Sequence, residues 1–210
     1  MNFDETNTFE TAAVSYLASP ECIRMTLDVY ELVPKVKETV LLRFWNCMIN
    51  ELKDKLKAYT SWSIQPSSDE DLMKLANYCG IELRQKKAAD EICSYEVYFR
   101  ITFENKAISF GLIMNDAWKN KLEDFPDSLK ETMSSLRDRG WKTDYRGKWP
   151  AWKDTQINPL SHNTLVDFAK SDSAPKSIAK DFIVFFQEFY LKIEQANQEL
   201  SKIKIDKQPA

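Results

Sequence analysis

The chain has 210 residues, the length of one ordinary domain, and its hydrophobic content of 43% is enough for a real core. Its formal net charge of −3 and its pI near 5.4 do not favour wholesale binding to nucleic acid or anionic membranes, because the global field repels polyanions. Only four glycines occur, so loops that cradle phosphate through the backbone are scarce.

The cysteines and the single histidine do not form a recognisable metal site. No CxxC pair occurs and His162 has no cysteine neighbour, which excludes zinc binding with standard spacing. Scattered cysteines most often behave as small buried hydrophobic residues in a reducing compartment. The four cysteines are Cys22, Cys47, Cys79 and Cys93. The polar N-terminus does not resemble a signal peptide, and no long apolar run occurs. We expect a cytoplasmic protein with no membrane span and no bound metal.

A long helix is predicted in the first third of the chain. Residues 1–20 are weakly patterned, and they and the polar tail 204–210 are candidates for flexible ends. Residues 21–59 have a helical pattern that Pro34 interrupts. After the proline, apolar side chains recur every fourth residue and form one stripe, at Val36, Val40, Phe44, Met48, Leu52 and Leu56. This stripe predicts a long helix packed on the core.

The strand signals lie in the middle of the chain. Residues 59–66 are typical of a short strand, and a capped helix that stops at Gly80 is predicted next. In residues 94–114, apolar side chains alternate with polar ones on both sides of Asn105-Lys106. This alternation predicts a β-hairpin with one face packed on helices.

Helices dominate the rest of the chain. Residues 124–140 predict a helix that Gly140 ends, and a short helix capped by Ser161 or Asn163 is predicted near 163–170. A long helix is predicted from about 175 to 203, with an aromatic seam formed by Ile178, Phe182, Phe185, Phe189 and Ile193. The order of elements predicts a single α+β domain over residues 1–210. We expect a small antiparallel sheet of three to five strands packed against several α-helices, with long helices near both ends.

A candidate nuclease motif lies in FENK, residues 103–106. A Glu-x-Lys at the end of an apolar strand, with an acid about a dozen residues upstream, is the layout of a magnesium-dependent nuclease. Glu104 and Lys106 would supply the pair, and Asp90 or Glu91 the upstream carboxylate. However, strand alternation resumes directly after the motif, which favours a polar hairpin tip. We favour the turn, with no catalytic residue and no cofactor, and keep Mg²⁺-dependent catalysis as the alternative.

Other catalytic signatures are missing. His162 could act as a general base, but no motif supplies its nucleophile or its orienting group. A surface or capping role at a helix start is therefore the ordinary interpretation of this histidine. The sequence contains none of GxSxG, GxxxxGK(S/T), GxGxxG or HExxH, so most familiar enzyme classes lack their signature.

An aromatic-basic segment, RDRGWKTDYRGKWPAWKD, spans residues 137–154. Cations neutralise phosphate and flat aromatic rings stack on exposed bases, so this composition suits a nucleic acid, while its aromatics also suit a protein surface. The same rings could instead lock the loop onto the core. The candidate binding residues are Arg139, Trp141, Lys142, Tyr145, Arg146, Lys148, Trp149, Trp152 and Lys153.

Four segments together resemble part of a known family: RFWNCMINELKDKL, YEVYFRITFENKAISFGLIM, GKWPAWKD and LVDFAK. In this order they are similar to the region that follows the catalytic core in bacterial proteins of the PD-(D/E)XK nuclease superfamily. The resemblance spans about residues 35–200, and the family's catalytic core has no room ahead of it here. It therefore implies an accessory part standing alone, in a setting of bacterial or phage DNA conflict, and carries over no catalytic residue.

Three functions follow, in order of preference. The first is a non-catalytic binding or accessory module that acts through a protein partner, with residues 139–153 as its contact surface. The second is a divergent Mg²⁺-dependent nuclease that uses the FENK residues and an upstream acid. The third is a nucleic-acid binder without catalysis that uses residues 139–153.

Overall fold

The computed structural model describes residues 5–76, 78–86, 96–104, 106–115, 125–144 and 148–202. These ranges contain six α-helices and one six-stranded antiparallel sheet, which confirms the predicted α+β class. The strands are β1 (Trp62–Pro66), β2 (Gly80–Gln85), β3 (Val97–Glu104), β4 (Ala107–Met114), β5 (Lys142–Thr143) and β6 (Ala151–Asp154). Their order across the sheet is β1-β2-β3-β4-β6-β5, so most neighbours in the sheet are also neighbours along the chain.

The six helices of the described residues are α1 (Glu5–Leu17), α2 (Ile23–Lys55), α3 (Asp69–Lys74), α4 (Asp127–Asp138), α5 (His162–Lys170) and α6 (Ser173–Ser201). Those from α2 onward follow the predicted order. Two predicted caps are present: the Ser68 hydroxyl accepts a hydrogen bond from the backbone N–H of Asp71, and the Ser161 hydroxyl accepts one from Thr164. Both bonds satisfy N–H groups that have no partner inside the first helical turn.

The prediction that Gly80 stops a helix is wrong. Helix α3 ends earlier, at Leu75, whose backbone is left-handed with φ 47°. Gly80 instead begins β2, where a Cβ atom would lie 1.9 Å from the carbonyl oxygen of Ile101 on β3. Glycine is needed here because the two strands approach closely. Strands β2, β5 and β6 were not among those predicted by name, so the sheet has six strands where three to five were expected.

Helix α2 is continuous through Pro34, contrary to the predicted interruption. Proline removes the N–H that would bond to the carbonyl of Tyr30, four residues earlier. Tyr30 is 74% exposed, and water can therefore reach this part of the helix. The loss of one solvent-accessible hydrogen bond does not end the helix.

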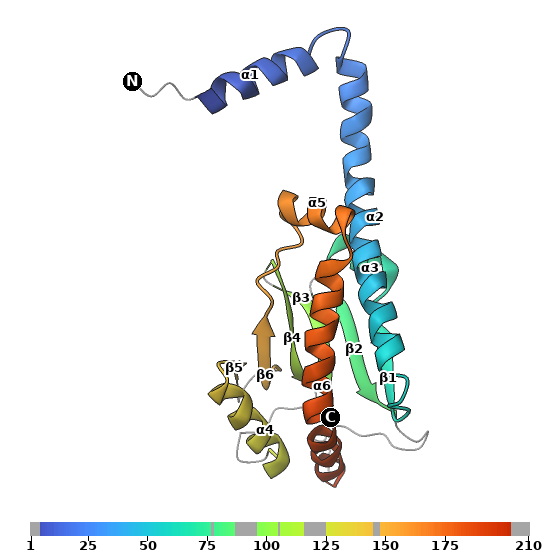
Figure 1. Cartoon of the computed structure of the whole chain (residues 1–210), viewed down its shortest axis with the longest axis vertical. Coiled ribbons are helices and arrows are strands. Elements are labelled where there is room, and N and C mark those ends of the chain that lie inside the picture. Colours follow the sequence, from blue (N-terminus) through green and yellow to red (C-terminus); the bar gives the residue numbers. More distant parts are fainter. Residues whose placement is uncertain are drawn as a thin grey trace, which may run out of the picture.

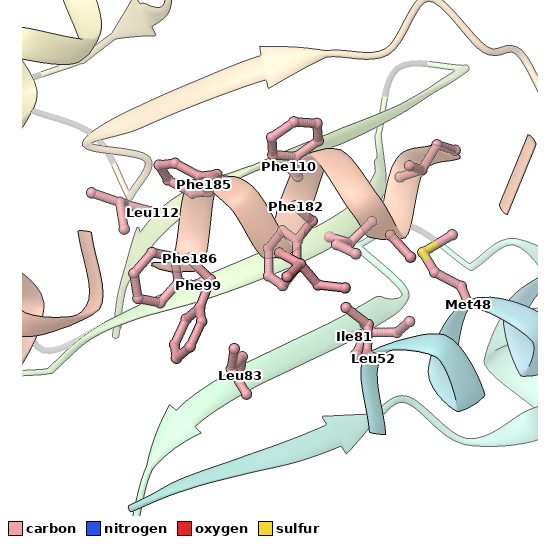
Figure 2. Packing of buried hydrophobic residues seen from close by; sticks show 14 of the residues in the cluster. Met48, Leu52, Ile81, Leu83, Phe99, Phe110, Leu112, Phe182, Phe185 and Phe186 are labelled. Carbon is pink, nitrogen blue, oxygen red and sulfur yellow. The ribbon is translucent and has the colours of Figure 1, made fainter. Parts of the chain in front are cut away.

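The core lies between the sheet and the helices α2 and α6. Figure 2 shows phenylalanines of α6 beside side chains of the strands, with Met48 and Leu52 of α2 at the other end of the same cluster. The Phe99 ring on β3 packs edge-on against Phe185 and Phe186 of α6, with centroid distances of 5.2 and 5.1 Å. Such pairs add about 0.5–1.5 kcal/mol each to the free energy gained by burying their area. The predicted aromatic seam of the last helix is therefore the main contact between helix and sheet.

The N-terminal part of the structure extends away from this core. Figure 1 shows the first half of α2 rising past α5, with α1 projecting from its end. We call residues 5–36 the arm, and the remaining described residues the body. The weakly patterned segment 1–20 thus contains a helix, α1, that belongs to the arm.

Candidate protein-interaction surface

The FENK residues lie at the tip of a β-hairpin, as predicted. Strands β3 and β4 pair antiparallel along their whole length, and Glu104 lies opposite Ala107 in this register. Lys106 is exposed and has a left-handed backbone, φ 67°, which is typical of a tight turn. Asn105 and the two upstream candidates, Asp90 and Glu91, lie outside the described residues. Within the described residues, no group of three or more His, Cys, Asp or Glu side chains could hold a metal ion.

The tryptophans of the aromatic-basic segment lie against the body. The Trp141 ring is 4.6 Å from the Phe185 ring on α6 and 5.5 Å from Phe110 on β4. Trp152 lies in β6 opposite Gly111 of β4, where a glycine Cβ would lie 2.9 Å from the Trp152 Cβ. Trp149 is half-buried. The Trp141 ring therefore packs on the body, and the backbone of Trp152 is part of the sheet.

Two cations of this segment form ion pairs with the body. Arg139 donates two hydrogen bonds to the Glu188 carboxylate on α6, one of them 2.8 Å long. These hydrogen bonds lower the pKa of Glu188, and the pKa of Arg139 is raised for the same reason. Lys142 donates to Asp154 at 2.6 Å, and Ser109 donates to the other oxygen of that carboxylate at 2.7 Å.

The remaining candidates of the segment are only partly placed. Lys153 is exposed on β6, opposite Phe110 of β4. The carbonyl of Lys148 accepts a hydrogen bond from the Met114 N–H, which ties the backbone to the end of β4. Tyr145 and Arg146 lie outside the described residues. The described part of the segment therefore forms one edge of the sheet. Two of its cations, Arg139 and Lys142, are paired within the protein.

A charged cluster that the sequence analysis did not single out lies on β2 and β3. Arg84 contacts Glu82 at 2.7 Å and Glu96 at 2.9 Å, and Arg100 contacts Glu82 at 3.3 Å. The Arg84 guanidinium also lies 3.7 Å from the centroid of the Tyr98 ring. Two cations and two anions balance one another here, an arrangement that supports the sheet. These residues occupy the polar positions of the strand alternation, which a sequence pattern assigns to solvent.

The arm exposes an unusually large apolar surface. Eleven of its large apolar side chains are exposed, with fractions from 38% for Ile23 to 74% for Tyr30. They are Val14, Tyr16, Leu17, Ile23, Met25, Leu27, Val29, Tyr30, Leu32, Val33 and Val36. Single exposed apolar residues are normal on a protein surface, but so many on two adjacent helices are unusual.

A groove lies where the arm meets the body. It has a volume of about 410 Å³ and runs between α2 and the short helix α5. Its α2 wall includes Val29, Leu32, Val33, Val36 and Val40, and its α5 wall includes His162, Leu165, Val166 and Ala169. The lone histidine of the chain therefore lies at the start of α5, as predicted, beside an apolar groove and not in a polar catalytic cluster.

The predicted apolar stripe of α2 explains why the groove exists. Phe44, Met48, Leu52 and Leu56 of this stripe are buried, but Val40 is only partly covered and Val36 is 60% exposed. The stripe thus extends beyond the last side chain that the body covers. A signal for this was present in the sequence: IRMTLDVYELV, residues 23–33, has apolar side chains on more than one side of a helix.

Comparison of the chain with protein-family models, with curated proteins and with solved structures found no match. The resemblance to the region after the PD-(D/E)XK catalytic core stays a prediction from its short aromatic motifs. None of the described helices is both long and apolar enough to cross a membrane.

Proposed function

We propose that the chain is a non-catalytic binding module that acts through a protein partner, and that the partner binds the arm and the groove beside α5. The observation that carries this proposal is the group of eleven exposed apolar side chains, four of which (Val29, Leu32, Val33 and Val36) line the groove. A setting in bacterial or phage DNA conflict is part of the proposal and rests on the aromatic motifs alone.

The chemistry of the groove favours a protein over a phosphate-bearing ligand. From residue 10 to residue 40 the chain has three cations, Arg24, Lys35 and Lys37, against five acids, Glu10, Glu21, Asp28, Glu31 and Glu38. This charge is net acidic and repels polyanions. An open groove with valine and leucine walls instead fits an amphipathic helix, whose apolar face meets such a groove at positions i, i+3, i+4 and i+7.

The arm is a better-supported contact surface than residues 139–153. Arg139 and Lys142 of that segment already have partners in the body, and Trp141 packs on two phenylalanines. A partner that used these side chains would first have to break those contacts. No described contact of the body has to break before a partner covers Val29 or Val36, which are 55% and 60% exposed.

Reconstituted binding tests the proposal. A partner identified by co-purification from the source cells is purified, and its affinity is measured for the wild type and for Val29→Glu/Val36→Glu. Because two charges would have to enter an apolar contact, we expect affinity to fall by about a hundredfold or more. The matched control is Val184→Glu/Leu191→Glu, which alters two exposed apolar residues of α6 and should leave affinity unchanged.

Two results would contradict the proposal. One is equal binding of the partner by the arm variant and the wild type. The other is cleavage of DNA or RNA by the purified protein with Mg²⁺ that Glu104→Ala abolishes, which would assign the chain to the metal-dependent nucleases.

A further inference from the structure

This inference rests on the proposed function and names the partner. We propose that the arm binds a second copy of this chain, in an antiparallel arrangement about a two-fold axis that passes between Leu32 and Val33 of α2. The two copies would cover each other's exposed apolar stripe and fill each other's groove.

The stripe beside the groove exposes enough apolar area for such a dimer. The exposed fractions of Met25, Val29, Leu32, Val33 and Val36 amount to an area on the order of 500 Å². A standard interface covers about 800 Å² on each partner, of which roughly 60% is apolar. The stripe therefore matches the apolar share of one side of a stable interface.

The apolar stripe beside the groove is complementary to itself. Its members are separated by 4, 3, 1, 3 and 4 residues, so the spacing is the same in both directions; they are Met25, Val29, Leu32, Val33, Val36 and Val40. An interface between identical copies about a two-fold axis needs such a surface, because residue i meets residue j and residue j meets residue i. Antiparallel pairing places Met25 opposite Val40, Val29 opposite Val36 and Leu32 opposite Val33.

Charge selects the antiparallel direction. The same register places Asp28 of one copy on the same flank of the interface as Lys35 of the other, within two residues of the same level, twice in each dimer. A parallel pairing would instead bring Lys35 of one copy to the flank of Lys37 of the other. Opposite charges across an interface set the orientation, and like charges disfavour the wrong one.

The groove lies where the second copy would need it. Val36 and Val40 line one wall of the groove, and Leu165 and Val166 of α5 line the other. In the antiparallel register, Val36 and Val40 are the residues that meet Val29 and Met25 of the second copy. The start of the second copy's α2 would thus enter the groove with its apolar side chains directed at both walls.

Analytical ultracentrifugation between about 1 and 100 µM tests whether the wild type dimerises. We expect twice the monomer mass at the upper concentrations, and self-association on the order of tenfold or more weaker for Val29→Glu/Val36→Glu. The control Val184→Glu/Leu191→Glu should dimerise like the wild type. Dimerisation that the arm substitutions leave unchanged would overturn the inference.

A charge exchange tests the register. Asp28→Lys and Lys35→Asp should each weaken self-association, because each creates two like-charge pairs per homodimer. An equimolar mixture of the two variants should associate as well as the wild type, because both pairs become Lys with Asp again. A mixture that associates no better than the separate variants would exclude this antiparallel register.

Two outcomes separate this inference from the proposed function. If the wild type stays monomeric but a different purified protein binds it and binding is lost in Val29→Glu/Val36→Glu, the second copy is wrong and the interaction module stands. If the monomer instead sediments with phosphatidylcholine–phosphatidylglycerol vesicles and the same variant does not, the arm binds a lipid surface and both proposals fail.

Discussion

The arm and the body contain the two halves of one helix, and the halves differ in what covers them. In the body, Met48 and Leu52 of α2 are fully buried beneath α6 and the sheet. In the arm, Val29 and Val36 continue the apolar pattern of the same helix but are mostly exposed. Periodicity in the sequence therefore identifies the apolar face of a helix, but it does not tell whether the rest of the protein covers that face.

The largest expected effect is the loss of stability when a buried residue of α2 is truncated, compared with an exposed residue of the same stripe. Met48→Ala should lower the free energy of unfolding by about 2–5 kcal/mol, because it leaves a cavity in the core. Val36→Ala, on the same stripe, should change it by no more than about 0.5 kcal/mol. Urea unfolding, at a protein concentration too low for association, measures both. Equal losses would show that the arm is packed as tightly as the body.

A smaller effect comes from adding a methyl group. Gly80→Ala should cost roughly 1–3 kcal/mol, because its Cβ would lie 1.9 Å from the Ile101 carbonyl oxygen and β2 would have to move from β3. Val36→Ile adds one carbon to the arm, where side chains are exposed, and should be nearly neutral. Thermal unfolding of the two variants compares them. A neutral Gly80→Ala would contradict the close strand pairing.

The smallest effect is a pH dependence within the body. Burial raises the pKa of Asp154, but hydrogen bonds from Lys142 and Ser109 outweigh it and the pKa lies below its ordinary value. A carboxyl whose pKa is lower in the folded state stabilises the protein above its unfolded pKa, and loses this effect as pH falls through the folded pKa. The stability advantage of the wild type over Asp154→Asn should therefore shrink below about pH 4.

Unfolding curves of both proteins at several pH values measure this difference. A gap that widens as the solution becomes more acidic would contradict the assigned hydrogen bonds. The comparison also bears on residues 139–153, because Lys142 of that segment is one of the two donors to Asp154.

The elements with strong local signals were predictable. The hairpin of β3 and β4 followed from two alternating runs around a turn, and the cap of α5 at Ser161 from its hydroxyl side chain. The aromatic seam of α6 was readable because its phenylalanines recur at helical spacing. Each of these signals is a pattern within a few neighbouring residues, which local sterics and hydrogen bonding convert into structure.

The errors occurred where a distant residue decided the outcome. Gly80 was taken as a helix stop because glycine is common there, but its neighbour in space is Ile101 on another strand. Pro34 was expected to interrupt α2, yet the flanking turns continue through it. The arm was missed as a surface, because apolar spacing alone does not tell a covered stripe from an uncovered one.

By itself, the sequence determined that the chain is an α+β protein with long apolar helices and a β-hairpin formed by β3 and β4. It could do so because hydrophobic periods and turn residues act locally. Only the tertiary structure decided which half of α2 the body covers and which cations of residues 139–153 are paired. Both outcomes depend on contacts between segments that are distant in the chain. Such contacts determine how much of α2 the sheet and α6 cover, and which acid lies next to each cation.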